Sequence, residues 1–150
     1  MPTKQVTIVE GQVVFFPTWG TLSKDELKRY DEEYLGVLEK TSHTFVHGIY
    51  DYSGLNGLPP LRELTNLRVG KHPKVGWSVF TGVRSAVLKF FASLTVQFFG
   101  QRVRFVDTNA DALKFLQSVD ATLPALSRVD LDEITVRTRA TYGEKVGSPT

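Results

Sequence analysis

Residues 45–55 have the sequence FVHGIYDYSGL, an apolar segment followed directly by an Asp-x-Ser-Gly-Leu motif. The apolar segment, rich in β-branched and aromatic residues, predicts a buried strand over 44–50, and the small polar residues after it predict a turn. This turn sets a carboxylate, Asp51, and a hydroxyl, Ser53, at the carboxyl end of the strand. Open α/β sheets carry their functional groups at this end of their strands. The stretch therefore predicts both an α/β fold and the place of its functional site.

The flanking sequence predicts an alternation of strands and helices. Residues 6–16 alternate around a Glu10-Gly11-Gln12 break, which is typical of a β-hairpin. Ser23, followed three residues later by Glu26, predicts a capping box at the start of a helix over 24–40. The other expected elements are a helix near 59–68, a strand at 75–81, an apolar helix at 84–98, a strand at 102–106, a helix after Thr108 and a further strand at Ile134–Arg139.

This order predicts a single α/β domain with a mixed, mostly parallel sheet. The elements follow one another as β-β-α-β-α-β-α-β-α, with a C-terminal extension. Strands separated by helices of this length are joined by right-handed crossovers, which set neighbouring strands parallel. We expect the domain to span residues 1–124 and the extension to span residues 125–150, with a strand at 134–139 and a frayed end at 147–150.

The amino-acid composition disfavours or excludes several classes of protein and of functional site. Of the 150 residues, 41% are hydrophobic and 23% are charged, which favours a globular domain over a disordered chain. A formal net charge of +2 is too small to predict a nucleic-acid-binding surface. The absence of cysteine excludes disulfides, thiolate zinc sites and cysteine nucleophiles. No apolar run approaches the ~18 residues of a membrane span and no signal-peptide core is present, so we expect a cytoplasmic protein.

Two segments of the chain resemble a known family. The Asp-x-Ser-Gly-Leu motif after the third strand, and residues 104–108 before a helix at 111–116, resemble STAS-type domains. This is the fold of anti-sigma-factor antagonists and of the cytoplasmic ends of sulfate transporters. The segment Lys71-His72-Pro73 before the next strand makes the chain similar to a divergent bacterial branch, the STAS/SEC14-like proteins, most of which are uncharacterised.

The resemblance implies a regulatory, protein-binding module rather than an enzyme. In STAS regulators a serine in such a turn is phosphorylated by a partner kinase, which switches binding off. By resemblance this role falls on Ser53, with Asp51 beside it and Gly54 allowing the turn. STAS regulators carry a second aspartate just before the modified serine, and this chain lacks it. The alternative is a structural Ser/Asp turn that satisfies its own backbone.

The other polar residues do not predict a metal or catalytic site. His43 and His47 have a metal-binding spacing for a helix, but their neighbours predict a strand. Ser78 follows a glycine, Gly76, but the second glycine of a nucleophile elbow is missing. We therefore expect no metal, no cofactor and no catalytic activity.

The aromatic residues leave a second function open. Most of them are expected in the core. The rival interpretation is a cleft under the 84–98 helix that holds a small, lipid-like apolar ligand. A homodimer formed through this helix or through the C-terminal strand is a further expectation. The residues expected to line the ligand or dimer surface are Trp77, Phe90, Phe91, Leu94 and Phe98.

Overall fold

A computed structural model describes residues 3–57, 61–83, 86 and 102–143 of the chain. Its centre is a five-stranded sheet in the order β1-β2-β3-β4-β5. β1 pairs antiparallel with β2, and the other neighbours are parallel, which confirms the predicted mixed, mostly parallel sheet. The strands are β1 (Val6–Val9), β2 (Val13–Thr21), β3 (Val46–Gly57), β4 (Val75–Thr81) and β5 (Val103–Val106).

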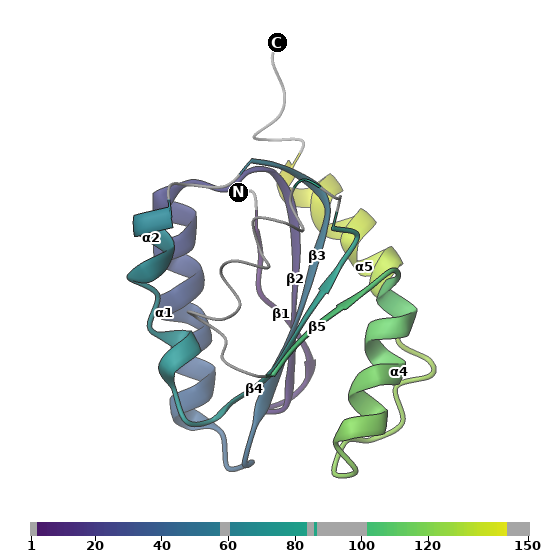
Figure 1. Ribbon diagram of the computed structural model, residues 1–150. Coiled ribbons are helices and arrows are strands. Elements are labelled where there is room, and N and C mark those ends of the chain that lie inside the picture. The colour runs from purple at the N-terminus through teal and green to yellow at the C-terminus, as the bar shows by residue number, and fades with distance from the viewer. Residues whose placement is uncertain (1–2, 58–60, 84–85, 87–101, 144–150) are drawn as a thin grey trace.

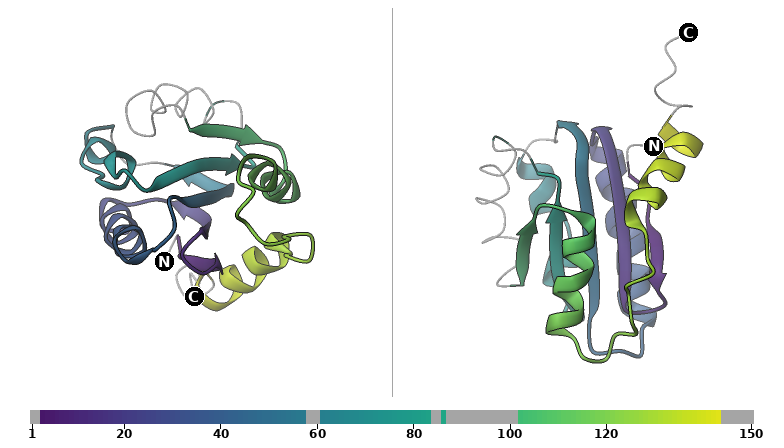
Figure 2. Two further views of the ribbon diagram at one scale, coloured as in Figure 1. Left: turned by 90° about the horizontal axis from the view of Figure 1, so that it is seen from below. Right: turned by 90° about the vertical axis from the view of Figure 1, so that its right-hand side faces the viewer.

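Helices cover both faces of this sheet (Figure 1 and Figure 2). α1 (Lys24–Lys40) and α2 (Leu61–Thr65) lie on one face, and α4 (Asn109–Val119) and α5 (Leu131–Thr138) lie on the other. A 3-10 turn, η1 (Val69–Lys71), precedes β4, and a π-helical turn, η2 (Arg139–Gly143), follows α5. The predicted helix at 84–98, apart from one residue, and the predicted frayed end lie outside the described residues. None of the helices in the described ranges is long and apolar enough to span a membrane.

Two helices begin at the capping residues that the sequence predicts. Ser23 has an extended backbone, and its hydroxyl accepts from the Glu26 N–H at 3.2 Å. Thr108 does the same for α4, accepting from the Asp111 N–H at 3.1 Å. Both contacts satisfy an N–H group that has no partner inside its own helix.

We expect Ser23→Ala to lower the free energy of unfolding by about 1 kcal/mol, because the first turn of α1 loses its side-chain acceptor. Ser23→Thr is the matched control, since threonine keeps the hydroxyl and should cost much less. Urea denaturation followed by circular dichroism measures both variants. Equal losses for the two would show that the hydroxyl does not stabilise the helix.

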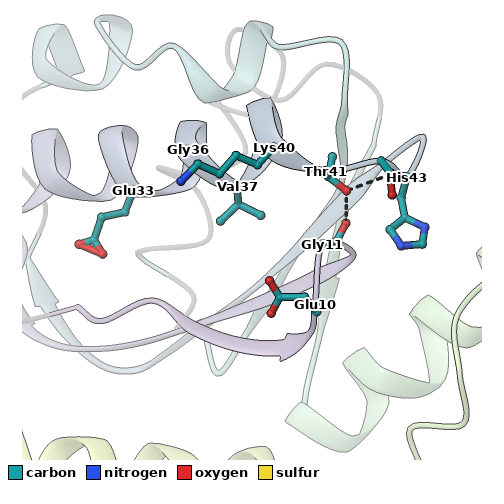
Figure 3. Close-up of a pocket in the computed structure, with 9 residues that line it drawn as sticks. Glu10, Gly11, Glu33, Gly36, Val37, Lys40, Thr41 and His43 are labelled. Atoms are coloured by element: carbon teal, nitrogen blue, oxygen red, sulfur yellow. Dashed lines mark hydrogen bonds between the residues drawn. The ribbon is translucent and has the colours of Figure 1, made fainter.

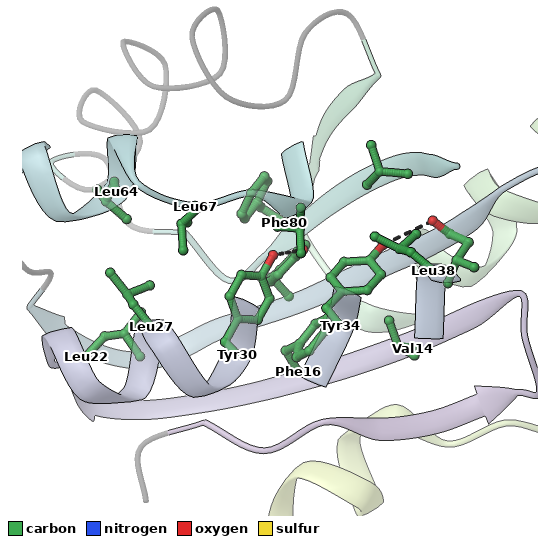
Figure 4. Close-up of a cluster of buried hydrophobic side chains, with 14 of the residues drawn as sticks. Val14, Phe16, Leu22, Leu27, Tyr30, Tyr34, Leu38, Leu64, Leu67 and Phe80 are labelled. Atoms are coloured by element: carbon green, nitrogen blue, oxygen red, sulfur yellow. Dashed lines mark hydrogen bonds between the residues drawn. The ribbon is translucent and has the colours of Figure 1, made fainter. Parts of the chain in front are cut away.

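The core on the α1 face is built around stacked aromatic rings (Figure 4). Tyr50 of β3 stacks on Phe16 of β2 and on Phe80 of β4, with ring centroids 4.9 Å apart in both pairs. Tyr30 of α1 meets Tyr50 hydroxyl to hydroxyl, at 2.5 Å. Burial raises the pKa of both tyrosines, so both hydroxyls stay protonated and one can donate to the other. This hydrogen bond ties α1 to the central strand of the sheet.

The core on the opposite face takes in residues from the C-terminal extension. Leu126 and Leu131 are 1% and 2% exposed, and they belong to one apolar cluster with Ile49 of β3 and Val79 of β4. Removing such side chains from water is the main favourable contribution to folding. Leu126 and Leu131 of the extension are therefore held against the same sheet as the rest of this core.

The predicted turn at Asp51–Leu55 is wrong, because these residues belong to β3. The strand continues to Gly57, with β2 running beside it as far as Thr21. Partners on β2 for Asp51, Gly54 and Leu55 keep this segment in the sheet, and the register shifts at the two residues between Asp51 and Gly54. No local sequence signal marks this pairing.

The predicted strand at Ile134–Arg139 is also wrong. Its residues form most of α5 and the first residue of η2. Asp130 caps α5 by accepting from the Glu133 N–H at 3.0 Å. Leu131, Thr135 and Thr138 are buried at helical spacing, and this side outweighs the strand preference of the β-branched residues. Residues 134–139 therefore cannot form the strand-mediated homodimer contact that the sequence predicts.

Candidate functional site

The candidate site lies near the middle of β3, at the level where β4 stops. Asp51 pairs with Thr81, the last residue of β4, and from there on β2 is the one described strand that pairs with β3. Asp51 is only 4% exposed, whereas the side chain of Ser53 is exposed. α4 and α5 each contribute to the site, and a residue after α5 completes it. We call this set the Ser53 site, and its members are Asp51, Ser53, Asn109, Thr135 and Arg139.

The carboxylate of Asp51 accepts four hydrogen bonds. Its Oδ1 accepts from the backbone N–H of Ser53 at 3.0 Å and from the Ser53 hydroxyl at 2.7 Å. Its Oδ2 accepts from the Asn109 amide at 3.1 Å and from the Thr135 hydroxyl at 2.9 Å. β3, α4 and α5 are therefore joined at a single buried carboxylate.

Asn109, the first residue of α4, is itself fixed in orientation. Its side-chain amide nitrogen also donates to Asp132 of α5 at 2.8 Å, and its carbonyl oxygen accepts from the Thr81 hydroxyl at 2.6 Å. Because a buried amide must place its donors and its acceptor correctly, these contacts leave it a single orientation. The N–H group that faces Asp51 is thus set by the fold.

The Asp51 carboxylate is ionised at neutral pH. Burial alone would raise its pKa, but the hydrogen bonds from Ser53, Asn109 and Thr135 stabilise the charged form more strongly. The net result is a pKa below the usual value for aspartate. The site therefore contains a fixed negative charge beneath the exposed Ser53.

Arg139, the first residue of η2, brings the opposite charge to the same hydroxyl. Its Nη2 donates to Ser53 Oγ at 3.2 Å and to the backbone carbonyl of Thr18 at 3.2 Å. The hydroxyl of Ser53 thus donates to a carboxylate and accepts from a guanidinium. Both partners orient it, and its oxygen stays at the surface.

This geometry presents a hydroxyl and does not assemble a catalytic triad or a metal centre. The histidine side chains that hydrogen-bond in the described ranges do so elsewhere, His47 with Asp120 and Trp77, and His72 with Lys74. No group of three metal-ligating side chains occurs among the described residues. A carboxylate with a lowered pKa is also a weak general base. The described part of the site therefore consists of the Ser53 hydroxyl held between a carboxylate and a guanidinium.

The sequence analysis proposed Asp51, Ser53 and Gly54, and it did not include three residues that the structure places beside Ser53 or its Asp51 partner. The structure brings Asp51, Ser53 and Gly54 together, although on a strand rather than in a turn. Asn109 was overlooked, although its place beside the Thr108 cap at a helix start was a usable signal. The two other missed residues, Thr135 and Arg139, lie in the segment that was predicted to be a strand.

The expected apolar surface is only partly described. Trp77 is half-buried on β4, where it packs edge-on against Phe115 of α4 with ring centroids 4.8 Å apart. The other expected lining residues lie outside the described part of the chain, and they are Phe90, Phe91, Leu94 and Phe98. The predicted ligand or dimer surface under the 84–98 helix stays a prediction.

His47, whose role the sequence left open, is a structural residue at the other end of the strand. It is 2% exposed, its Nδ1 accepts from the Trp77 N–H at 2.9 Å, and its Nε2 meets Asp120 Oδ2 at 2.8 Å. Burial lowers the pKa of this imidazole, an effect that the nearby Asp120 carboxylate partly offsets. The neutral ring, with its proton on Nε2, satisfies both contacts. His43, the other histidine of the spacing considered for a metal, is exposed.

Two surface hollows flank the loop that leads into β3. One, of about 480 Å³, lies beside Trp77, with Phe45, Arg102 and Val119 also in its lining. The other, of about 490 Å³, lies between α1 and the β1–β2 turn, where Thr41 donates to the Gly11 carbonyl at 2.6 Å (Figure 3). Neither hollow is lined by residues of the Ser53 site.

Comparison with known proteins defines the fold. No protein-family model matches the sequence, and no curated protein matches it. The structure is similar to that of the anti-sigma factor antagonist SpoIIAA in its unphosphorylated form, with a TM-score of 0.60 and 12% identity over 79% of this chain and 98% of that chain. It is also similar to an uncharacterised protein from Shewanella loihica PV-4, of the DUF3478 family and with a SpoIIAA-like fold. Here the TM-score is 0.56 and the identity 16%, over 76% of this chain and 91% of that chain. The chain therefore has a STAS-like fold, which confirms the resemblance predicted from the sequence.

Proposed function

We propose that this protein is a non-enzymatic regulatory module of the bacterial cytoplasm that binds another protein through the carboxyl end of β3. Phosphorylation of Ser53 switches this binding. The observation that carries the proposal is the exposed Ser53 hydroxyl, which Asp51 and Arg139 hold in place where β3 extends beyond β4. The fold supports it, because one similar structure is that of an anti-sigma factor antagonist, in an unphosphorylated form.

The switch follows from the charge that a phosphate would add. A phosphoserine carries about −1.5 to −2 charges at neutral pH. A phosphate on Ser53 would replace the hydroxyl proton that is now donated to Asp51. Its negative charge would lie beside the ionised Asp51 carboxylate. A partner that docks on a surface with a neutral hydroxyl would then meet like charge or an altered surface. Binding is thereby coupled to the state of a single side chain.

Site-specific photo-crosslinking in the native host tests the binding surface. A photoreactive residue at Asn56, which is exposed near the end of β3, is expected to capture one protein, and the same residue at Lys114 on α4 is the matched control. With the captured protein purified, Ser53→Asp should weaken binding on the order of tenfold, whereas Ser53→Ala should leave it nearly unchanged.

Two results would argue against the proposal. One is capture of the same protein from Asn56 and from Lys114, which would place the contact elsewhere. The other is equal affinity of the Ser53→Asp and Ser53→Ala variants. Intact-mass measurement on protein from its own host, with an added phosphate mapped to Ser53, tests the modification itself.

A second candidate function is the carriage of a small apolar ligand. The observation behind it is the hollow of about 480 Å³ beside Trp77, whose lining includes Phe45 and Val119 as well as the charged Arg102 and Asp120. Native mass spectrometry distinguishes the two functions. Extra mass that is lost on denaturation would support a bound ligand, whereas a covalent phosphate would support the switch.

A further inference from the structure

Arg139 is a cation without a carboxylate partner in the described part of the chain. Six ion pairs are found there, and none of them includes Arg139. Its Nε is buried and has no hydrogen-bond acceptor among the described residues, while the two N–H groups of Nη2 donate to the Thr18 carbonyl and to the Ser53 hydroxyl. Nε and Nη2 form one edge of the planar guanidinium, the edge that binds oxyanions through two parallel hydrogen bonds. The Nε–H is therefore the one unused donor of this edge, and the adjacent Nη2 already contacts Ser53.

Two glycines make room for this arrangement. A Cβ on Gly54 would lie 2.7 Å from Arg139 Nη2 and 3.2 Å from the Thr18 carbonyl, so a larger residue would push the guanidinium away. Gly82 has a φ of +66°, and a Cβ there would lie 2.8 Å from the Ser53 Cβ. The backbone thus keeps space on two sides of the Ser53–Arg139 contact.

The neighbouring Asp51 does not neutralise Arg139 directly. Its two oxygens are occupied by the hydrogen bonds from Ser53, Asn109 and Thr135, and it is buried beneath the site. Ser53 Oγ lies between the two charges, 2.7 Å from Asp51 Oδ1 and 3.2 Å from Arg139 Nη2. A negatively charged group at Ser53 would be repelled by the carboxylate and attracted by the guanidinium. It would therefore lie on the Arg139 side.

We propose that Arg139 is an oxyanion-binding residue, which holds a phosphate group at Ser53 through its Nε and Nη2. The proposal rests on the proposed function for the source of this phosphate, a phosphoserine at position 53. Free phosphate offers the same oxygens and is the other source to be tested. Charge-assisted bonds to the phosphate would hold Arg139, the first residue of η2, against β3 more strongly than its present contact with the Ser53 hydroxyl does.

The test uses the full chain with phosphoserine installed genetically at position 53. The second pKa of the phosphate, about 6 for a free phosphoserine, is followed by phosphorus-31 NMR. We expect this pKa to be about one unit lower with Arg139 than in Arg139→Gln, because the guanidinium stabilises the dianion. Arg139→Lys should give an intermediate value, since it keeps the charge without the planar fork. Arg137→Gln is the control, because Arg137 is 68% exposed and pairs with Glu133 one turn away.

An equal phosphate pKa in all these proteins would overturn the proposal. Should Arg139→Gln fail to fold, the comparison with Arg139→Lys still decides it. In a second arm, inorganic phosphate is added to the unmodified protein, and the Arg139 Nε–H resonance is followed. A saturating shift would mean that free phosphate also occupies the site, and no shift alongside the pKa effect would restrict it to phosphoserine. Because the phosphate is installed genetically, lack of phosphorylation in the host would refute the switch alone.

Discussion

Asp51→Ala is expected to lower the free energy of unfolding by about 3 kcal/mol, because it removes a buried charged acceptor that serves several donors at once. The donors of Ser53, Asn109 and Thr135 would lose their acceptor, two of them inside the protein. The loss should appear as a lower midpoint in urea denaturation at pH 7. Contacts between β3, α4 and α5 should weaken together, so hydrogen exchange should rise in all three elements.

Asp132→Ala is the matched control for this variant. Asp132 also accepts a hydrogen bond from Asn109, but its side chain is exposed. Its loss should cost less than about 1 kcal/mol, since water can replace the acceptor. If the two variants lost the same amount, burial of the Asp51 carboxylate would not be what stabilises the site.

The contribution of Asp51 should also depend on pH, with a definite sign. Its pKa in the folded protein lies below the unfolded value, so the unfolded chain binds the proton more readily. The stabilisation is therefore complete above the unfolded pKa of about 4 and is lost as the pH falls through the lower folded value. In Asp51→Asn this part of the pH dependence should be absent.

Local patterns predicted the elements whose ends are decided by neighbouring residues. The caps at Ser23 and Thr108 were recognisable because the hydroxyl and its N–H partner are three residues apart. The hairpin of β1 and β2 was recognisable from alternation around Gly11, whose φ is +70°. In these cases the residues whose contact forms the structure are close together in the sequence.

The Ser53 site was only half predictable, because its parts meet over long sequence separations. Asp51 and Ser53 are two residues apart, whereas Asn109 and Thr135 lie 58 and 84 residues from Asp51. Whether Asn109 and Thr135 contact Asp51 depends on how α4 and α5 pack on the sheet. The segment with Thr135 was assigned the wrong structure, since its β-branched residues match a strand when the burial of its other side is unknown. The wrong assignment of residues 134–139 thus hid Thr135 and Arg139, two of the five residues of the Ser53 site.

His47 joins three elements at the amino end of the sheet. Its ring is buried on β3, accepts from the Trp77 N–H of β4 and contacts Asp120, the residue that ends α4. Gly76 allows this position, since a Cβ there would lie 2.4 Å from His47 Nδ1. The ring is therefore confined to one place and, with a pKa lowered mainly by burial, to its neutral form.

We expect His47→Ala to lower the free energy of unfolding by about 2–3 kcal/mol, because a cavity forms and the Trp77 N–H loses its acceptor. The wild-type protein should also lose stability as the pH falls below about 6.5, since the unfolded histidine then binds a proton more readily than the folded one. His47→Ala should lack this loss, so urea midpoints of the two proteins should converge between pH 7 and pH 5. The exposed His43 provides the control, and His43→Ala should keep the wild-type profile. A wild-type profile in His47→Ala would instead assign the acid sensitivity to another group and leave His47 with a packing role alone.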